Sequence, residues 1–351
     1  MHENCLAPDL EHILQYTLPL WEELRGERLF ISGGTGFFGC WLLESFAWAN
    51  DRLGLGAKAV ALTRSPERFM ARSPHLARNS ALTLLKGDIR TFEFPVGTFS
   101  HIIHAATETP LKAEPIDPPD MFRSNIEGTQ RMLELADKCG AYKFLFTSSG
   151  AIYGKQPSEM TNIPEEYNGA PEPTDITSAY GQSKRACEFL CASAGSFSLQ
   201  TKIARCFAFV GPRLPLNANY AIGNFIRDVL QGKPIQITGD GSPYRSYLYS
   251  ADLAIWLWKI LINGRHARPY NVGSDADLTI AQLAAEVVKT ISPKLKVESA
   301  KHPLPDQPAQ RYVPSIQRAR SELDLDVWIN LPDAIRRTAN YYISKDRLCK
   351  L

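Results

Sequence analysis

The chain has 351 residues and a formal net charge of +2, so it is long enough for a large core and nearly neutral. Its basic residues are scattered, which argues against a nucleic-acid surface, and no apolar run is long enough to span a membrane. The seven cysteines form no Cys-x-x-Cys pair, and Cys187 and Cys191 have no nearby ligands that would complete a metal site. We therefore expect a cytoplasmic protein with reduced thiols and no bound metal.

Residues 1–27 come first and are interpreted as a helical extension packed on the body of the protein. Their apolar side chains recur at helical spacing, and Pro19 must interrupt the helix. The apolar positions are Leu10, Ile13, Leu14, Leu18, Trp21 and Leu24. Nothing in this segment indicates chemistry, so we expect a structural role.

A glycine-rich turn, Gly33-Gly-Thr-Gly-Phe-Phe-Gly39, stands between the first expected strand, Leu29–Ile31, and a helical run, Cys40–Ala49. Gly33 permits a sharp turn, Gly36 lets the backbone approach a pyrophosphate, and Gly39 lets the helix lie close to the sheet. The helix then directs free N–H groups and the positive end of its dipole at the phosphates. A glycine-rich turn without a ligand is the alternative at this stage.

Two further strands follow, and the residues after them bear on the cofactor. Ala57–Thr63 is expected to be the second strand, and Arg64 comes directly after it. An acidic residue at this place binds the 2′-hydroxyl of NAD, whereas an arginine accommodates the 2′-phosphate of NADP. Arg64 therefore indicates NADP, unless it is a solvated strand end. After the third strand, Leu82–Lys86, Asp88 is placed either to accept a hydrogen bond from an adenine amino group or to bond its own backbone.

Strands and helices continue to alternate up to residue 150. The fourth strand begins at His101 and ends in small residues that would let a cofactor lie against the backbone, and its His104 is interpreted as a buried, hydrogen-bonded histidine. Met121–Cys139 is an amphipathic helix, and Tyr142–Phe146 is the fifth strand. This alternation predicts an α/β fold with a doubly wound parallel sheet and ligands at the carboxyl ends of its strands.

Three polar, proline-rich segments are expected to be loops: Pro110–Asp120, Gln156–Asp175 and Lys301–Pro314. A loop as long as the second is usually functional or mobile. A helix over Ala179–Ala194 and a sixth strand over Thr201–Phe207 follow it, and the alternation weakens after residue 212.

We therefore divide the chain into three parts. Residues 1–27 are the helical extension, and residues 28–212 form the cofactor-binding domain, to which residues 245–273 return. Residues 213–244 and 274–351 form a smaller, C-terminal substrate-binding lobe.

Tyr180 and Lys184 lie four residues apart on an expected helix and so share one face. A phenol is a poor base at neutral pH, and a nearby ammonium lowers its pKa by favouring the phenolate. Ser149, at the end of the fifth strand, could hold the substrate oxygen while Tyr180 takes or returns its proton. These are the parts of a hydride-transfer site acting on a hydroxyl or carbonyl group. The alternative is a surface tyrosine stacked on a lysine stem.

The combination of motifs resembles the extended short-chain dehydrogenases/reductases, and within them the NAD(P)-dependent nucleotide-sugar epimerase/dehydratase family. The match covers about residues 28–325. The matching residues are Gly33–Gly39, Asp88-Ile89, His104–Ala106, Asn125, Gly128-Thr129, Ser148-Ser149, Tyr153-Gly154, Tyr180, Lys184, Arg205, Gly211-Pro212, Gly239–Gly241, Arg245 and Asp252.

The resemblance implies a Rossmann-type fold, NAD or NADP as cofactor, a UDP- or dTDP-sugar as substrate, and a homodimer formed through the helices that carry Asn125 and Tyr180. It implies that Ser149, Tyr180 and Lys184 are catalytic. The expected cofactor-binding residues are Gly33, Thr35, Gly36, Phe37, Phe38, Gly39, Arg64, Asp88, Ile89, Ala105, Ala106, Thr107, Thr147, Tyr180, Lys184 and Phe207. The expected substrate-binding residues are Ser149, Gly150, Asn224 and Arg245, whose guanidinium suits a phosphate.

Two departures from the family pattern bear on the reaction. Dehydratases carry an Asp-Glu pair just after the catalytic Ser/Thr, and glucuronate decarboxylases carry a Glu, but this chain has Gly150 and Ala151 there. Dehydration therefore lacks its acid and base, and decarboxylation is disfavoured. In the sixth-strand motif, Ala208 replaces the usual Asn and cannot donate a hydrogen bond to a nucleotide phosphate.

We expect an enzyme that oxidises or reduces a sugar hydroxyl, at C4, and the leading hypothesis is a nucleotide-sugar 4-epimerase. The alternatives are an NADPH-dependent 4-ketosugar reductase, which Arg64 favours, and a glucuronate decarboxylase or dehydratase. A cofactor-sensing protein without catalysis is a remote alternative, because such proteins typically lose the active-site Tyr or Lys, here Tyr180 and Lys184.

Overall fold

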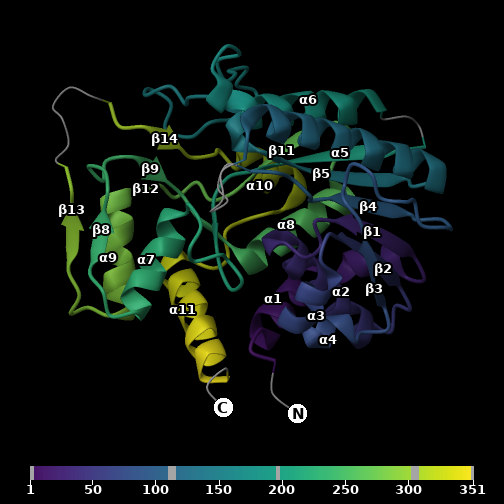
Figure 1. The fold of residues 1–351 in the computed structure, drawn as a ribbon, viewed down its shortest axis with the longest axis horizontal. Helices are drawn as coiled ribbons and strands as arrows, with labels where there is room; N and C mark the ends of the chain where they lie inside the picture. The colour runs from purple at the N-terminus through teal and green to yellow at the C-terminus, as the bar shows by residue number, and fades with distance from the viewer. Residues whose placement is uncertain (1–3, 110–115, 195–197, 302–307, 349–351) are drawn as a thin grey trace.

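The computed structural model describes residues 4–109, 116–194, 198–301 and 308–348, with a parallel sheet of seven strands at its centre (Figure 1). The strand order is β11-β6-β5-β4-β1-β2-β3. The strands are β1 (Arg28–Ser32), β2 (Lys58–Thr63), β3 (Leu82–Lys86), β4 (His101–His104), β5 (Lys143–Ser149), β6 (Gln200–Cys206) and β11 (Pro269–Val272). The order reverses between β1 and β4, where such sheets bind ligands. The predicted doubly wound α/β fold is confirmed.

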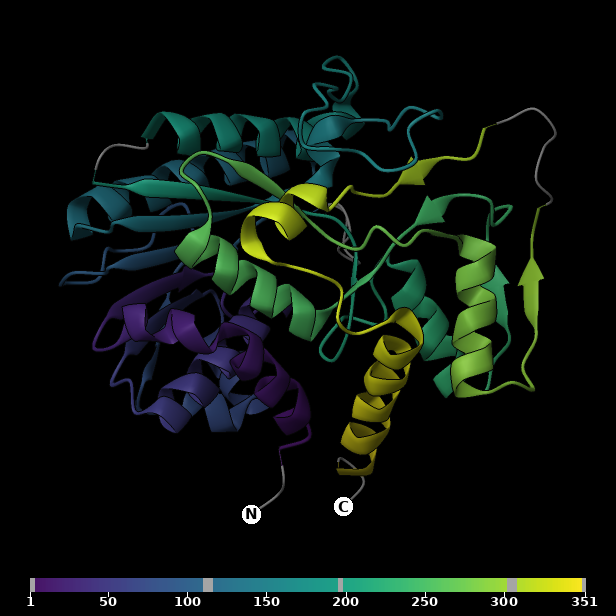
Figure 2. The ribbon, with the colours of Figure 1, turned by 180° about the vertical axis from the view of Figure 1, so that it is seen from behind.

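Helices cover both faces of this sheet (Figures 1 and 2). Alternate residues of β1 show why, since Leu29 and Ile31 pack into the core shared with α2 and α8, whereas Phe30 packs into the core under α5 and α6. These helices are α2 (Phe37–Leu53), α5 (Pro118–Cys139), α6 (Ala179–Ala194) and α8 (Ser250–Asn263). With both faces covered, the strands next to the switch point carry short apolar runs, such as Leu29–Ile31 in β1 and Ala59–Leu62 in β2.

The N-terminal segment folds as α1 (Ala7–Thr17) and η1 (Leu18–Leu24), which pack against α2 and α8. Leu10, Ile13 and Trp21 are buried there. Pro19 lies in the first turn of η1, directly after α1 ends, as the sequence indicated. Two short helices, α3 (Pro66–Arg72) and α4 (Pro74–Ala77), connect β2 to β3.

A smaller lobe lies to the left of the sheet in Figure 1 and to its right in Figure 2. Its helices are α7 (Ala221–Leu230), α9 (Ile280–Ile291) and α11 (Leu331–Leu348), whereas α10 (Gln317–Leu323) packs on β11 and α8 of the large domain. The short strands of the lobe form a sheet of order β12-β9-β14 and a β13-β8 pair, and β7 and β10 form a separate pair that packs on α8. They are β7 (Phe209–Val210), β8 (Ile235–Ile237), β9 (Tyr244–Arg245), β10 (Leu248–Tyr249), β12 (Leu278–Thr279), β13 (Val297–Ser299) and β14 (Arg311–Tyr312). The lobe meets the carboxyl end of β6, since Tyr312 packs on Phe207.

Several expected elements match closely. The third strand and the Ala179–Ala194 helix have the predicted bounds, and α8 and β11 fall within residues 245–273 and pack on or join the large sheet. The fifth strand continues to Ser149. Of the expected loops, residues 110–115 and 302–307 lie outside the described residues. No helix in the described ranges is long and apolar enough to cross a bilayer.

Candidate active site

The glycine-rich turn joins β1 to α2 and leaves no room for side chains at two positions. Gly33 has φ +70°, and a Cβ there would lie 2.5 Å from the backbone nitrogen of Ala106. A Cβ on Gly39 would overlap the carbonyl oxygen of Gly33. α2 starts directly after Gly36, so its free N–H groups face the crevice at the end of β1. The turn therefore has the shape of a phosphate cradle.

A cavity of about 270 Å³ lies beside this turn, at the carboxyl ends of β1 to β4. Many of the expected cofactor residues line it: Gly33, Thr35, Gly36, Arg64, Asp88, Ile89, Ala105, Ala106 and Thr107. Residues to which sequence reasoning gave no cofactor role also line it: Leu62, Thr63, Gly87, His104, Glu108, Ser124, Asn125 and Gly128. Phe37 and Phe38 open α2, and Phe38 packs edge-on against Phe209 at 5.1 Å between ring centroids.

Arg64 does not stand alone at the end of β2. It forms an ion pair with Glu108, with 3.1 Å between Nη1 and Oε1. A 2′-phosphate would have to compete with this carboxylate for the guanidinium, and the negative charge of Glu108 would repel it. The expectation of NADP, which depended on Arg64, is therefore not supported.

Asp88 and His104 are both held by protein partners. Asp88 accepts hydrogen bonds from the backbone and side chain of Arg90, which help to lower the pKa of its carboxyl group although partial burial acts the other way. His104 is buried between the hydroxyl groups of Ser32, at 2.8 Å, and Thr129, at 3.1 Å. Burial lowers the pKa of His104 to about 3, so its ring is neutral. The prediction of a buried, hydrogen-bonded histidine is confirmed.

Asn125 on α5 ties the cofactor crevice to α6. Its side chain accepts from the backbone N–H of Glu108 at 2.9 Å and from the hydroxyl of Thr107 at 3.0 Å, and it donates to Ser183 at 3.0 Å. A buried asparagine in the middle of a helix is the sequence signal for such a role, because its amide needs several partners.

Ser149, Tyr180 and Lys184 come together at the ends of β5 and α6. Lys184 is buried, donates to the carbonyl oxygen of Thr147 at 2.7 Å, and lies 5.9 Å from the centroid of the Tyr180 ring. Burial lowers the pKa of Lys184 and raises that of Tyr180, and the nearby hydroxyl of Ser149 partly offsets the rise. The arrangement can exchange a proton between a phenol and a bound hydroxyl group.

Of the expected substrate residues, Gly150 directly follows Ser149 at this centre. A Cβ on Gly150 would lie 2.7 Å from the ring of Phe207 and 2.8 Å from the hydroxyl of Tyr312, so no acidic side chain fits there without displacing both rings. Arg245 on β9 donates to the carbonyl oxygen of Tyr244. Asn224 lies on α7, where its side-chain oxygen accepts from Arg227 at 3.0 Å.

Among the residues that the structure describes, no group of three or more His, Cys, Asp or Glu side chains could hold a metal ion. Cys187 and Cys191 are buried in the core under α5 and α6. Tyr312 is the main residue that the sequence analysis missed. Tyr312 lies beside Gly150, more than 150 residues away in the sequence, and the sequence carries no local signal for that contact.

The parallel sheet, the glycine-rich turn and the cavity beside it define a dinucleotide-binding fold of the Rossmann type. The model of the NAD dependent epimerase/dehydratase family matches residues 29–273, and the chain belongs to this family. Among curated proteins, UDP-glucuronic acid decarboxylase 2 of Arabidopsis thaliana is 28% identical over 316 residues, which are 90% of this chain and 68% of that protein. UDP-glucuronic acid decarboxylase 1 of Xenopus tropicalis is 27% identical over 319 residues, covering 90% and 72%.

Solved structures share the fold at lower identity. UDP-glucose 4-epimerase from Thermotoga maritima, with UDP-glucose, has a TM-score of 0.72 at 19% identity and covers 91% of this chain and 99% of its own. UDP-glucuronic acid 4-epimerase from Bacillus cereus, in complex with NAD, has a TM-score of 0.74 at 21% identity and covers 90% and 96%.

Proposed function

We propose that this enzyme is an NAD-dependent nucleotide-sugar 4-epimerase that acts on a UDP- or dTDP-sugar. The glycine cradle and the cavity beside it fit a dinucleotide, with Gly33, Thr35 and Gly36 at the pyrophosphate. NAD, when bound, would supply the hydride acceptor. Arg245 would bind the diphosphate of the substrate, and Asn224 would lie near its base.

In the proposed mechanism, Tyr180 takes the proton of the C4 hydroxyl group as C4 loses its hydride, and it returns the proton to the same oxygen when the hydride is delivered to the opposite face of C4. Lys184 stabilises the phenolate through its positive charge, and Ser149 hydrogen-bonds the reacting oxygen. Between the two steps the bound sugar must turn so that the hydride returns to the other face of C4.

The observation that carries the proposal is the packing at Gly150. Dehydration needs an acid and a base near C5 of the sugar, and the glucuronate decarboxylases of the family carry a Glu just after the catalytic Ser/Thr. Here the ring of Phe207 and the hydroxyl of Tyr312 occupy the place where such a side chain would begin. Proton exchange at C4 needs no group beyond Ser149, Tyr180 and Lys184.

A glucuronate decarboxylase is the second candidate, because the curated relatives named above are decarboxylases. A 4-ketosugar reductase has weaker support, since the Arg64–Glu108 ion pair removes the reason to expect NADPH. A cofactor-sensing protein without catalysis would have no need for a buried Lys184 beside Tyr180.

The test supplies the purified enzyme with NAD and either UDP-glucose or UDP-glucuronate and identifies the products by NMR. An epimerase gives the C4 epimer with no net NADH and no CO₂, whereas a decarboxylase releases CO₂ and a UDP-pentose. Tyr180→Phe should lower turnover by at least about a thousandfold with NAD binding kept. Tyr142→Phe, a matched change at an exposed phenol, should leave turnover unchanged. Loss of CO₂ from the glucuronate, or full activity of Tyr180→Phe, would contradict the proposal.

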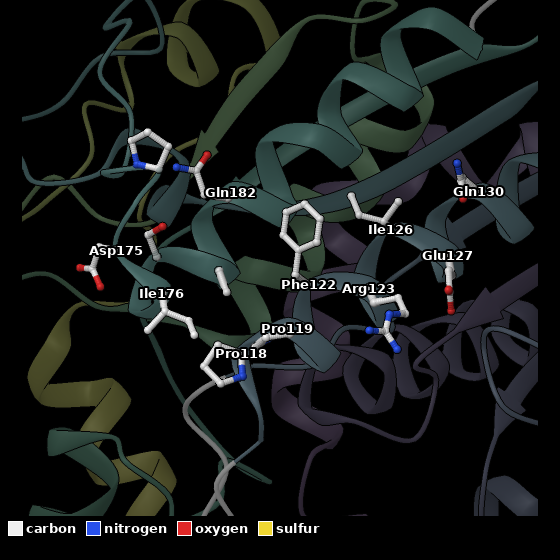
Figure 3. Close-up of a pocket in the computed structure, with 13 residues that line it drawn as sticks. Pro118, Pro119, Phe122, Arg123, Ile126, Glu127, Gln130, Asp175, Ile176 and Gln182 are labelled. Carbon is white, nitrogen blue, oxygen red and sulfur yellow. The ribbon is translucent and has the colours of Figure 1, made fainter.

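We also propose that the enzyme is a homodimer that pairs through α5 and α6. An open cavity of about 660 Å³ lies between α5 and the segment that precedes α6, with Phe122, Ile126 and Ile176 at its surface (Figure 3). Ile176 is 62% exposed, and Phe189 on α6 is 72% exposed. Exposed apolar side chains gathered around one open cavity, as Phe122 and Ile176 are here, are typical of an interface.

The free cysteines, most of them buried, support a reducing, cytoplasmic setting.

A further inference from the structure

The buried face of α6 is fastened to the end of β5 by two neighbouring hydrogen bonds. Lys184 donates to the carbonyl oxygen of Thr147 at 2.7 Å. One helical turn later, the buried carboxylate of Glu188 accepts from the hydroxyl of Ser148 at 2.5 Å. The two bonds therefore hold α6 at the point where β5 presents Ser149.

The charge of Glu188 is balanced by Arg205 on β6. Nε of Arg205 donates to Oε1 at 3.0 Å and Nη2 donates to Oε2 at 2.8 Å, so the guanidinium and the carboxylate meet edge to edge. The two side chains are only 12% and 11% exposed. A buried pair of this kind often adds little net stability, because removing two charges from water offsets most of their attraction. Its fixed bond directions instead set how the elements that it joins lie relative to one another.

The other side of the same guanidinium reaches further segments. Nη1 of Arg205 donates to the hydroxyl of Tyr153 at 2.8 Å and to the carbonyl oxygen of Glu165, in the long polar loop, at 3.2 Å. Tyr153 ends η2 (Gly150–Tyr153), the turn that directly follows β5. Its hydroxyl in turn donates to the side-chain oxygen of the buried Asn271 on β11 at 2.8 Å. Arg205 therefore connects α6 with η2, the loop and β11.

Asn271 continues these contacts toward the smaller lobe. Its side-chain N–H groups donate to the carbonyl oxygens of Ile163 at 2.9 Å and Ser315 at 3.1 Å. The backbone N–H of Ile163 donates to Val313, and its carbonyl oxygen accepts from the N–H of Ser315, both at 2.9 Å. Val313 directly follows Tyr312 of β14, so a connected set of hydrogen bonds runs from α6 to the strand that the lobe places beside the site.

We infer that Arg205 is a positioning residue for the reaction. Its guanidinium holds the helix that carries the proton-transfer pair in one arrangement with the lobe segments beside the site. The proposed function, on which this inference rests, requires Tyr180 of the large domain to meet a sugar whose diphosphate is bound by Arg245 of the lobe. A displacement of about 1 Å between reacting groups can lower a rate about a hundredfold. Arg205 acts on the reaction through the elements that it joins.

Arg205→Lys tests this role, since a lysine keeps the charge beside Glu188 but cannot form the paired bonds and also reach Tyr153. We expect kcat to fall about tenfold to a hundredfold, with KM changed less than about twofold and NAD-induced stabilisation kept. Arg268→Lys is the matched control, because Nε and Nη2 of Arg268 form a second bidentate pair with Glu322 at the amino end of β11. It should keep the kcat of the wild type. Equal losses of kcat in the two variants, or no loss in Arg205→Lys, would overturn the inference.

A structural comparison gives the second measurement and needs no sugar. Crystal structures of the NAD-bound wild type and Arg205→Lys give the distance across the site between the hydroxyl oxygen of Tyr180 and Cα of Tyr312. This distance should change by about 0.5 Å or more in Arg205→Lys, the tolerance of a catalytic arrangement, and stay unchanged in Arg268→Lys.

Tyr153→Phe carries the test should Arg205→Lys fail to fold. It keeps the pair of Arg205 with Glu188 but breaks the link to Asn271, so it should change the same distance in the NAD-bound crystal structure and lower kcat by a smaller factor. An unchanged distance in every variant that folds would contradict the inference. If no nucleotide sugar is turned over, the proposed function fails, whereas the distance still decides the role of Arg205.

Discussion

Gly39 shows how a single residue can set both the fold and the site. It lies in the first turn of α2, where a side chain would overlap the carbonyl oxygen of Gly33 and the backbone of Gly34. Because the obstacle is backbone rather than the end of a flexible side chain, α2 would have to move away from β1. That movement would widen the phosphate cradle.

We therefore expect Gly39→Ala to lower the free energy of unfolding by about 1–3 kcal/mol, as overpacking does, and to weaken NAD binding. The measurement is thermal unfolding with and without NAD, since a ligand stabilises the folded state according to its affinity. Gly239→Ala is the matched control, because nothing lies within 4 Å of its Cβ position. Equal NAD-induced stabilisation of Gly39→Ala and wild type would contradict this reading of the turn.

The neighbours of a side chain can be predicted from the sequence where they lie only a few residues away along the chain. The glycines lie within seven consecutive residues, so the strand-to-helix turn can be recognised from the sequence. Tyr180 and Lys184 lie four residues apart on α6, so their proximity follows from helix geometry. The partner of Arg64 is Glu108, 44 positions further along the chain, and nothing in either neighbourhood predicts the pair. Tyr312 and Gly150 are separated further still. For these residues the side chain can be read from the sequence but its neighbours cannot, which is why the expectation of NADP from Arg64 is not supported.

At the scale of elements, α1 joins parts of the chain that are far apart in sequence. Asp9 on α1 is buried, accepts a hydrogen bond from the hydroxyl of Tyr249 on β10 at 2.7 Å, and forms an ion pair with Arg337 on α11. His12, one turn later, contacts the buried Asp252 of α8 at 3.0 Å. The extension is therefore fastened by polar contacts as well as by its apolar face.

We expect Asp9→Ala to lower the free energy of unfolding by about 1–3 kcal/mol, because it leaves the hydroxyl of Tyr249 and part of the Arg337 charge without a partner. Denaturant unfolding measures this. Glu11→Ala, on the same helix, should cost less than about 1 kcal/mol, since Glu11 is exposed and its ion pair with Arg52 spans 3.6 Å. Similar losses in both variants would show that the buried contacts add nothing beyond the charge.

The predicted bounds of an element agree with the observed bounds where the local sequence signals are strong, and they differ where those signals are weak. The Ala179–Ala194 helix was predicted with its observed bounds, since Asp175 caps the short turn before it. The helix expected from Met121 begins at Pro118 instead, because Asp117 accepts from the N–H of Asp120 and prolines suit the first turn. The short strands β9 and β14 gave no periodic signal, since two residues cannot show one.

At the scale of the whole molecule, the smaller lobe reaches the carboxyl ends of β5 and β6, where Tyr312 packs on Phe207 and lies beside Gly150. The large domain supplies Ser149, Tyr180 and Lys184, and the smaller lobe supplies Tyr312 and Arg245. The parallel sheet could be predicted because alternating strands and helices permit few topologies. The lobe could not be predicted in detail, because its strands pair across long stretches of chain and their register with the large domain depends on loops such as the one that carries Gln156.

The exposed apolar side chains on and near α5 predict which surface pairs in the proposed homodimer. Phe122 on α5 is 39% exposed and lies beside the cavity between α5 and the start of α6 (Figure 3). A two-fold interface repeats every contact, so a charge placed there is buried twice. We expect Phe122→Glu to weaken self-association by roughly a hundredfold or more, giving monomers where the wild type is dimeric in size-exclusion chromatography with light scattering.

The control for this change is Val96→Glu, which introduces the same charge at a residue that is 93% exposed and lies in the loop before β4. It should leave the dimer intact, because the side chain at that position already faces water. A wild type that stays monomeric at all concentrations would contradict the dimer itself. A Phe122→Glu variant that remains dimeric would instead remove α5 from the interface, since a buried, unpaired carboxylate costs more than a surface contact can restore.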